Sequence, residues 1–134
     1  MKIITFEDIK ETEREVHCPS GGFISYRYLL RSDGFGFSLH KTVIPKGEPQ
    51  FWHYKNHLES CYCISGHGIL TDLDNMVTHE ILPGTVYALD SHDAHFFQAL
   101  EETVLLCVFN PPLVGDETHS DDGSYRSSLE VCNG

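Results

Sequence analysis

A short polar stretch in the middle of the chain contains the residues best suited to chemistry. Glu59, Cys61 and Cys63 occupy alternate positions, so a β-strand would place one carboxylate and two thiols on the same face. A carboxylate on an inward face is costly to bury unless something neutralises it, and a metal ion does so. The pattern therefore predicts a metal ligand at Glu59, although pairing of this carboxylate with Lys55 or Arg27 would also explain it.

The spacing around this glutamate matches a metal-site pattern. The first motif of the cupin barrels, Gly-x5-His-x-His-x3-Glu-x6-Gly, is kept at Gly47, His53, Glu59 and Gly66. Lys55 stands where the second His is expected, so the resemblance implies a small barrel with an altered ligand set. The role of His53 stays open, because it could bind the metal or pack beside the neighbouring tryptophan.

The second cupin motif, Pro-x-Gly-x2-His-x3-Asn, falls on a Pro-Gly-Thr-Val-Tyr segment. Tyr87 takes the place of the third metal His, and His92 and His95 follow it. Glu59, Tyr87 and His95 would make an O,O,N site with open positions. Such a set suits Fe(II), or another divalent ion, better than structural zinc, which prefers closed N and S ligand sets. Alone, Tyr87 or His95 would be an ordinary core residue, and only their places relative to the motif favour ligation.

Other chemistries have weaker support. The pair Cys61 and Cys63 could bind a soft metal, but no second Cys-x-Cys pair accompanies it. The sequence has no glycine-rich phosphate loop, no nucleophile elbow and no convincing Ser/His/Asp order. A metal-assisted reaction is therefore the expected chemistry.

The elements that position these residues are short stretches rich in aromatic and β-branched side chains, which predict strands. They are Ile24–Leu30, Phe35–Ile44, Gln50–Tyr54, Leu58–Ile64, Ile69–Leu73, Thr78–Leu82, Thr85–Leu89, His95–Ala99 and Val104–Phe109. Turn residues separate them, among them Ser65 and Gly66. A capping box at Thr5 and Asp8 predicts a short helix from Phe6 to about Glu13. The expected fold is all-β, a cupin-type jelly-roll β-barrel with a short N-terminal helix.

Length and composition limit the remaining possibilities. The 134 residues fit a single domain over positions 1–134, in which residues from about 115 to 134 form a polar tail or a lid over the barrel mouth. A net charge of −11 without a Lys/Arg cluster argues against nucleic-acid binding. No apolar run is long enough to span a bilayer, and no secretory signal is visible. The protein is therefore expected in the cytoplasm, with its five cysteines reduced.

Several segments closely resemble the ectoine synthases, a family of cupins. They are residues 34–38, 54–59, 61–68, 83–95, 107–113, 115–119 and 121–125. The resemblance implies a cyclocondensation, in which the α-amino nitrogen of N4-acetyl-L-2,4-diaminobutyrate attacks its own acetamide carbonyl with loss of water. The activity would be that of a carbon–oxygen hydro-lyase that makes a compatible solute for osmotic protection. An amide carbonyl is a poor electrophile, and a metal polarises it. The family uses iron, and its ligand positions fall on Glu59, Tyr87 and His95.

The resemblance also implies the residues that contact the small-molecule substrate. By position these are Phe23, Arg27, Thr42, Tyr54, Cys107, Phe109 and Glu117. Glu117 matches a carboxylate that holds the substrate amine or accepts its proton, and Tyr54 is the second expected catalytic residue. Arg27 could take the substrate carboxylate by a bidentate contact.

One departure from the family keeps two alternatives open. Tyr26 stands where the family usually has an Arg, and loss of a guanidinium from the pocket wall would weaken carboxylate recognition. A paralogue that cyclises a related amide such as glutamine is therefore one alternative, and a non-catalytic solute-binding barrel is the other. The intact donors Glu59, Tyr87 and His95 argue against a pure binder. A homodimer that covers exposed sheet edges is expected.

Overall fold

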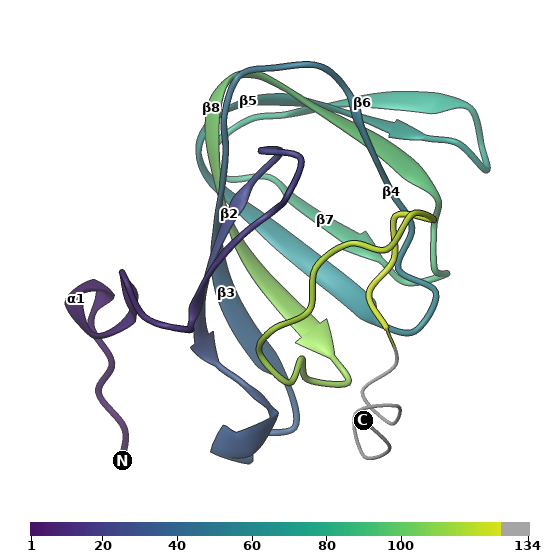
Figure 1. Ribbon diagram of the computed structural model, residues 1–134. Coiled ribbons are helices and arrows are strands. Elements are labelled where there is room, and N and C mark those ends of the chain that lie inside the picture. Colours follow the sequence, from purple (N-terminus) through teal and green to yellow (C-terminus); the bar gives the residue numbers. More distant parts are fainter. Residues whose placement is uncertain (127–134) are drawn as a thin grey trace.

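One antiparallel sheet curls on itself to form the molecule (Figure 1). The computed structural model describes residues 1–126. The sheet runs in the order β1-β2-β3-β8-β5-β6, with β4 paired to β8 and β7 paired to β5. The elements are α1 (Phe6–Ile9), β1 (Glu15–His17), β2 (Ile24–Leu29), η1 (Arg31–Asp33), β3 (Ser38–Ile44), β4 (Gln50–Trp52), β5 (Leu58–Asp72), β6 (Val77–Ile81), β7 (Val86–Leu89) and β8 (His95–Asn110). The predicted all-β fold with a short N-terminal helix is confirmed.

Strands β5 and β8 are longer than the sequence predicted. Each merges two expected strands, so that β5 has 15 residues and β8 has 16. The expected turn at Ser65 and Gly66 is wrong, because the chain continues through it with bulges in the pairing to β8. Gly66 has a φ of +98°, and a Cβ there would lie 2.4 Å from the carbonyl oxygen of Glu102. The glycine therefore bends a continuous strand instead of ending it.

The N-terminal helix is shorter than expected. Its start is as predicted, because the Asp8 carboxylate accepts a 2.8 Å hydrogen bond from the Thr5 backbone N–H. It ends at Ile9, since Lys10 is already extended and Glu11 has a φ of 60°. Among residues 1–126, no helix is long and apolar enough to cross a membrane.

The alternation predicted for β5 is confirmed. Glu59, Cys61 and Cys63 point inward and are at most 6% exposed. Tyr62 and Ile64 point outward and are 45% and 48% exposed. The carboxylate and both thiols thus belong to the barrel interior.

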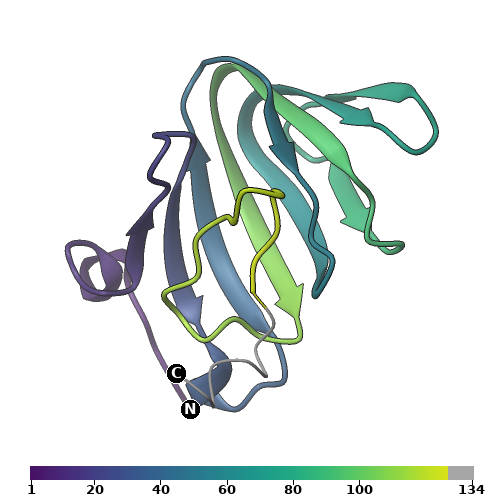
Figure 2. The same cartoon turned by 45° about the vertical axis from the view of Figure 1, so that its right-hand side comes forward.

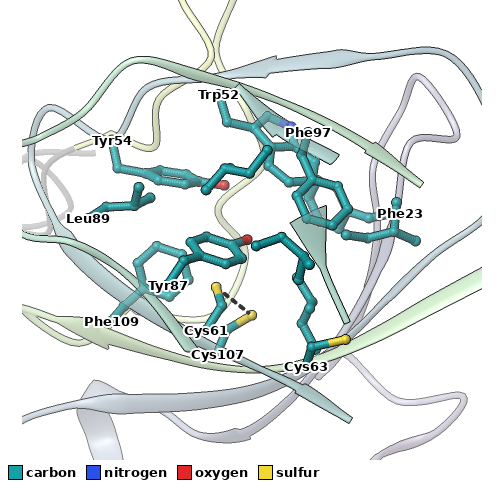
Figure 3. Packing of buried hydrophobic residues seen from close by; sticks show 14 of the residues in the cluster. Phe23, Trp52, Tyr54, Cys61, Cys63, Tyr87, Leu89, Phe97, Cys107 and Phe109 are labelled. Atoms are coloured by element: carbon teal, nitrogen blue, oxygen red, sulfur yellow. Dashed lines mark hydrogen bonds between the residues drawn. The ribbon is translucent and has the colours of Figure 1, made fainter. Parts of the chain in front are cut away.

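Aromatic rings form one wall of this interior (Figure 3). Trp52 and Phe97 stack with their ring centroids 5.8 Å apart, and Phe23 meets Trp52 edge-on at 5.9 Å. A Cβ at Gly68 would lie 2.4 Å from the Phe97 ring, so the glycine makes room for it. Burial of each such ring contributes about 2–3 kcal/mol.

The C-terminal segment, residues 113–126, returns across the barrel on the inner side of β2, β3 and β8 (Figure 2). Two hydrogen bonds from the loop between β4 and β5 hold the far end of the segment. The His53 N–H donates to the Gly123 carbonyl at 2.9 Å, and the Asn56 side chain donates to the Tyr125 carbonyl at 3.0 Å. The segment therefore packs as part of the barrel. The rest of the predicted tail, residues 127–134, lies outside the described residues.

Candidate metal and substrate site

Glu59 is buried beside two thiols. One of its carboxylate oxygens and the sulfurs of Cys61 and Cys107 lie within 4.8 Å of one another. Burial raises the pKa of Glu59 to about 8, and hydrogen bonds with the two thiols only partly oppose this shift. At neutral pH the carboxyl group therefore stays largely uncharged until a cation binds next to it.

Tyr87 reaches the same place from β7. The pairing of β7 with β5 sets Tyr87 opposite Cys61, and its hydroxyl points into the barrel (Figure 3). Burial raises the pKa of Tyr87 well above its ordinary value, and the nearby Cys61 and Glu59 raise it further. Tyr87 and Glu59 line one small cavity of about 20 Å³. Both oxygens are thus placed where a cation would favour their charged forms.

His95 begins β8 and is 1% exposed. Its Nδ1 lies 2.9 Å from the carbonyl oxygen of Asp93, and a carbonyl can only accept, so Nδ1 carries the hydrogen. Nε2 is then a free lone pair, and it is buried without a hydrogen-bond partner among the described residues. Burial lowers the pKa of His95, which keeps the ring neutral. An imidazole oriented through its other nitrogen is the usual form of a metal-binding histidine.

These three donors fit a divalent cation. Tyr87 is next to both of the others, because it shares a cavity with Glu59 and its ring centroid is 6.4 Å from that of His95. The buried Glu59 carboxyl and Tyr87 phenol interact with thiols, and Nε2 of His95 has no hydrogen-bond partner among the described residues, so a cation would give all three a charged partner. Hard oxygen donors with one imidazole suit Fe(II) or a similar ion.

Two other polar residues of the first motif lie elsewhere. His53 is half-buried, and its ring packs beside Phe51 at 6.3 Å. Lys55 is on the surface, where it forms a 3.1 Å ion pair with Asp122. Lys55 therefore pairs with the C-terminal segment at the exposed surface and does not neutralise Glu59.

The same cavity gathers most of the residues expected to bind substrate. Its walls include Phe23, Thr42, Tyr54, Cys107 and Phe109. They come from two strands, β3 and β8, and from two loops, so only the folded barrel brings them together.

Arg27 and Glu117 hold the C-terminal segment instead. Arg27 is fully buried and donates to the carbonyls of Gly115 at 2.8 Å and Glu117 at 2.7 Å. The Glu117 carboxylate accepts 2.7 Å hydrogen bonds from the backbone N–H groups of Val114 and Gly115. One of its oxygens is 3.8 Å from Arg27 Nη1. In this conformation both side chains close the segment over the cavity.

His119 is a site residue that sequence reasoning missed. Its Nε2 lies 2.7 Å from the Tyr54 hydroxyl, and its ring stacks on Tyr125 at 4.7 Å. Burial lowers the pKa of His119 to about 3, with a smaller effect from the charge of Arg27. The ring is therefore neutral at all ordinary pH values. The signal that could have found it is its place in a family-like segment, next to Glu117.

Tyr26 does not lie in the pocket wall, and that expectation is wrong. Along β2 the inward residues are Ser25 and Arg27, so Tyr26 faces outward. Its ring packs against Phe6 at 4.9 Å, and the ammonium of Lys41 lies 5.8 Å from its centroid. The Tyr26 departure therefore removes no guanidinium from the cavity.

An antiparallel barrel with inward carboxylate, phenol and imidazole donors defines a cupin-type protein. A family model described as ectoine synthase matches residues 1–129. The chain belongs to the ectoine synthase family, as the resemblance in the sequence implied.

Individual relatives agree with this assignment. The chain is 49% identical over 126 residues to the L-ectoine synthase of Alkalilimnicola ehrlichii, covering 93% of this chain and 94% of the relative. It is 48% identical to that of Marinomonas sp., with coverage of 89% and 92%. The crystal structure of ectoine synthase from P. lautus superimposes with a TM-score of 0.81 at 40% identity, covering 86% of this chain and 81% of that one. The Clostridium difficile EutQ structure, at 13% identity and a TM-score of 0.65, covers 82% of this chain and 80% of its own and shares the fold alone.

Proposed function

We propose that this chain catalyses the metal-dependent cyclocondensation of N4-acetyl-L-2,4-diaminobutyrate to ectoine, with loss of water, for compatible-solute synthesis. It is an enzyme of the hydro-lyase class. The observation that carries the proposal is the free, buried Nε2 of His95 next to Tyr87, which shares a cavity with the uncharged Glu59. Membership of the ectoine synthase family supports the reaction.

Glu59, Tyr87 and His95 would hold the metal, for which we infer Fe(II), with another divalent ion as a substitute. When bound, the metal would supply the Lewis acidity that an acetamide carbonyl needs. The protein keeps His95 neutral and correctly turned through Asp93. These interactions prepare the donors before any ion arrives.

The cavity must enlarge to admit substrate. With the C-terminal segment in place its volume is about 20 Å³, which is enough for roughly one water molecule. The substrate is much larger, so we infer that residues 113–126 move aside and then close again. Closure would exclude water, which favours a reaction that releases water and strengthens each polar contact with the substrate.

The hydrogen bond between Tyr54 and His119 directs the Tyr54 hydroxyl hydrogen away from the substrate. The neutral His119 can accept the Tyr54 hydroxyl hydrogen through Nε2, across 2.7 Å. The Tyr54 oxygen then keeps its lone pairs for the substrate amine, which must lose a proton as it attacks. We infer that Tyr54 orients the amine.

Glu117 is the candidate for the proton acceptor. Its carboxylate is buried at 1% exposure and now bonds the backbone of Val114 and Gly115. The substrate amine could replace those partners when the segment closes on it. Arg27 already donates to Ser25 and to two carbonyls of the segment, so it would then act chiefly by holding Glu117 in place and less by binding the substrate carboxylate.

Glutamine cyclisation has lost the feature that favoured it. That alternative depended on Tyr26 in the pocket wall, and Tyr26 packs on the outer side with Phe6. The donor set around Glu59 also argues against a protein that only binds a solute, because such a protein needs no Lewis-acidic metal.

We also propose a homodimer in the cytoplasm. The outer face of the sheet exposes apolar side chains that lie across from one another, since Tyr62 pairs with Val86 and Leu106. These three are 37–59% exposed. Such a patch suits contact with a second copy. The described cysteines are free thiols, which suits a reducing compartment.

Turnover of N4-acetyl-L-2,4-diaminobutyrate by the Fe(II)-reconstituted chain tests the function, with ring formation followed by NMR. The metal-stripped protein is the control. Metal-dependent appearance of ectoine supports the proposal. Absence of product from protein that has bound iron would contradict it, and glutamine would then be the next substrate to try.

A further inference from the structure

Two thiols meet directly across the central strand pair. Cys61 on β5 and Cys107 on β8 are opposite each other, and their sulfurs are 3.4 Å apart (Figure 3). Both side chains point inward and are 1% and 2% exposed. Because both strands have neighbours on either side, the backbone keeps the two cysteines opposite each other.

A carboxylate completes a triangle with these thiols. A Glu59 oxygen and both sulfurs lie within 4.8 Å of one another, close enough for small shifts to bring all three around one ion. Zinc–sulfur bonds of about 2.3 Å in a tetrahedral site put two sulfurs roughly 3.8 Å apart, so the pair needs little movement. The Tyr87 hydroxyl, which interacts with Cys61, is available as a fourth donor.

The neighbouring thiol provides a contrast. Cys63 is equally buried on the same face of β5, but its sulfur bonds the backbone carbonyl of Ser65 at 3.4 Å. That is the behaviour of a structural core cysteine. Cys61 instead has another sulfur, a carboxyl group and a phenol around it, all of which can release a proton. Four acidic groups packed together without a cation are an arrangement that a metal ion would stabilise.

We propose that Cys61, Cys107 and Glu59 bind one thiophilic divalent cation of the Zn²⁺ class. This soft donor set shares Glu59 with the iron ligands of the proposed function, so the two ions exclude each other. This zinc site rests on the proposed function only through the shared ligand Glu59. The zinc site could be absent while the ring-closing reaction occurs, and the reaction could be absent while zinc binds. On binding, both thiols release their protons to solvent and become thiolate ligands, so affinity rises with pH.

X-ray absorption at the zinc edge of the full chain decides the matter. Metal-free protein, kept reduced, receives one equivalent of Zn²⁺. The expected first shell contains sulfur at about 2.3 Å together with oxygen. A first shell of oxygen and nitrogen only would overturn the proposal, and so would failure to bind zinc. This measurement uses the unmodified protein and needs no variant to fold.

Cobalt substitution assigns the sulfurs. Co²⁺ bound by thiolates gives an intense charge-transfer absorption, which should weaken in Cys61→Ala and in Cys107→Ala and disappear in the double variant. Cys63→Ala is the matched control and should keep the full band, as should His95→Ala. Zinc affinity should fall about tenfold or more in Cys61→Ala, while Fe(II) affinity changes little. A band that survives the double variant would overturn the assignment. Iron binding without zinc–sulfur bonds would leave the proposed function intact and reject this site alone.

Discussion

Arg27 donates a 2.7 Å hydrogen bond to the backbone carbonyl of Glu117, 90 residues further along the chain. A second bond from the same guanidinium to the Gly115 carbonyl joins β2 to the C-terminal segment at two points. Arg27 is fully buried, so water cannot replace these donors. Arg27 therefore holds the near end of the segment closed, while His53 and Asn56 hold its far end.

Replacement of Arg27 should loosen the segment. In Arg27→Met the carbonyls of Gly115 and Glu117 lose their donors, at a cost of about 1–3 kcal/mol each if they stay buried. We expect residues 113–126 to be cut by protease at least several-fold faster, with the barrel itself intact. Lys55→Ala is the control, because its ion pair with Asp122 is exposed and should matter little. Equal cleavage rates in Arg27→Met and wild type would show that Arg27 does not hold the segment.

Removal of the Glu117 carboxylate should separate turnover from metal binding. Glu117 lies on the C-terminal segment and is no part of the donor set, so Glu117→Ala should keep its metal content. Without an acceptor for the amine proton, we expect kcat to fall about 100-fold or more. Metal analysis and NMR turnover on the same samples make the comparison. A fully active Glu117→Ala would refute the catalytic role of this residue.

Glu59 should make the metal-free protein less stable as pH rises. Its folded pKa of about 8 is above the ordinary value of 4.5, so stability is full below pH 4.5 and is lost as pH rises toward 8. At 1.36 kcal/mol per pH unit, the loss between pH 5 and pH 8 is about 3–4 kcal/mol. Denaturant unfolding of wild type and the neutral isostere Glu59→Gln measures it.

Wild type and Glu59→Gln should differ in opposite ways with and without metal: the variant should be the more stable protein without metal and the weaker binder with it. Metal-free Glu59→Gln should equal wild type near pH 4 and exceed it at pH 8. With metal present, Glu59→Gln should bind the ion poorly, and Glu59→Ala should lose both metal and activity. Parallel stability profiles for wild type and Glu59→Gln would mean that Glu59 is not the buried titrating group.

Local alternation was enough to predict the inward face of β5, because side chains on a strand alternate whatever the partner strand is. It was not enough to distinguish a turn from a bend at Gly66, since a glycine with positive φ occurs in both. Only the pairing with β8 shows that the strand continues through this residue. The partners of Arg27 were also beyond sequence reasoning. They lie 88 and 90 residues away and are set by the path of the C-terminal segment.

The outer apolar patch should pair two copies of the chain. Tyr62, Val86 and Leu106 are exposed next to one another, so a charge placed there would oppose association. Light scattering at micromolar concentration should give twice the chain mass of 15.2 kDa for wild type. Val86→Lys should shift the distribution toward monomer, whereas Met76→Lys, at an exposed position on the β5–β6 turn, should not. A wild-type monomer at this concentration would contradict the homodimer.

Tyr54 should act through its hydroxyl and not only through its ring. Tyr54→Phe keeps the packing against Phe109 but removes the hydrogen bond to His119, at a cost of about 0.5–1.5 kcal/mol in stability. If Tyr54 orients the substrate amine, Tyr54→Phe should lower kcat/KM about tenfold or more, because the phenol oxygen itself is lost. His119→Ala keeps the Tyr54 oxygen but removes its hydrogen bond to His119. We therefore expect a smaller loss in kcat/KM, together with faster protease cleavage of residues 113–126. Steady-state kinetics on both variants distinguishes the roles. If His119→Ala were as damaging as Tyr54→Phe, the hydroxyl would serve chiefly to anchor the C-terminal segment, and the proton acceptor would have to be found elsewhere on that segment.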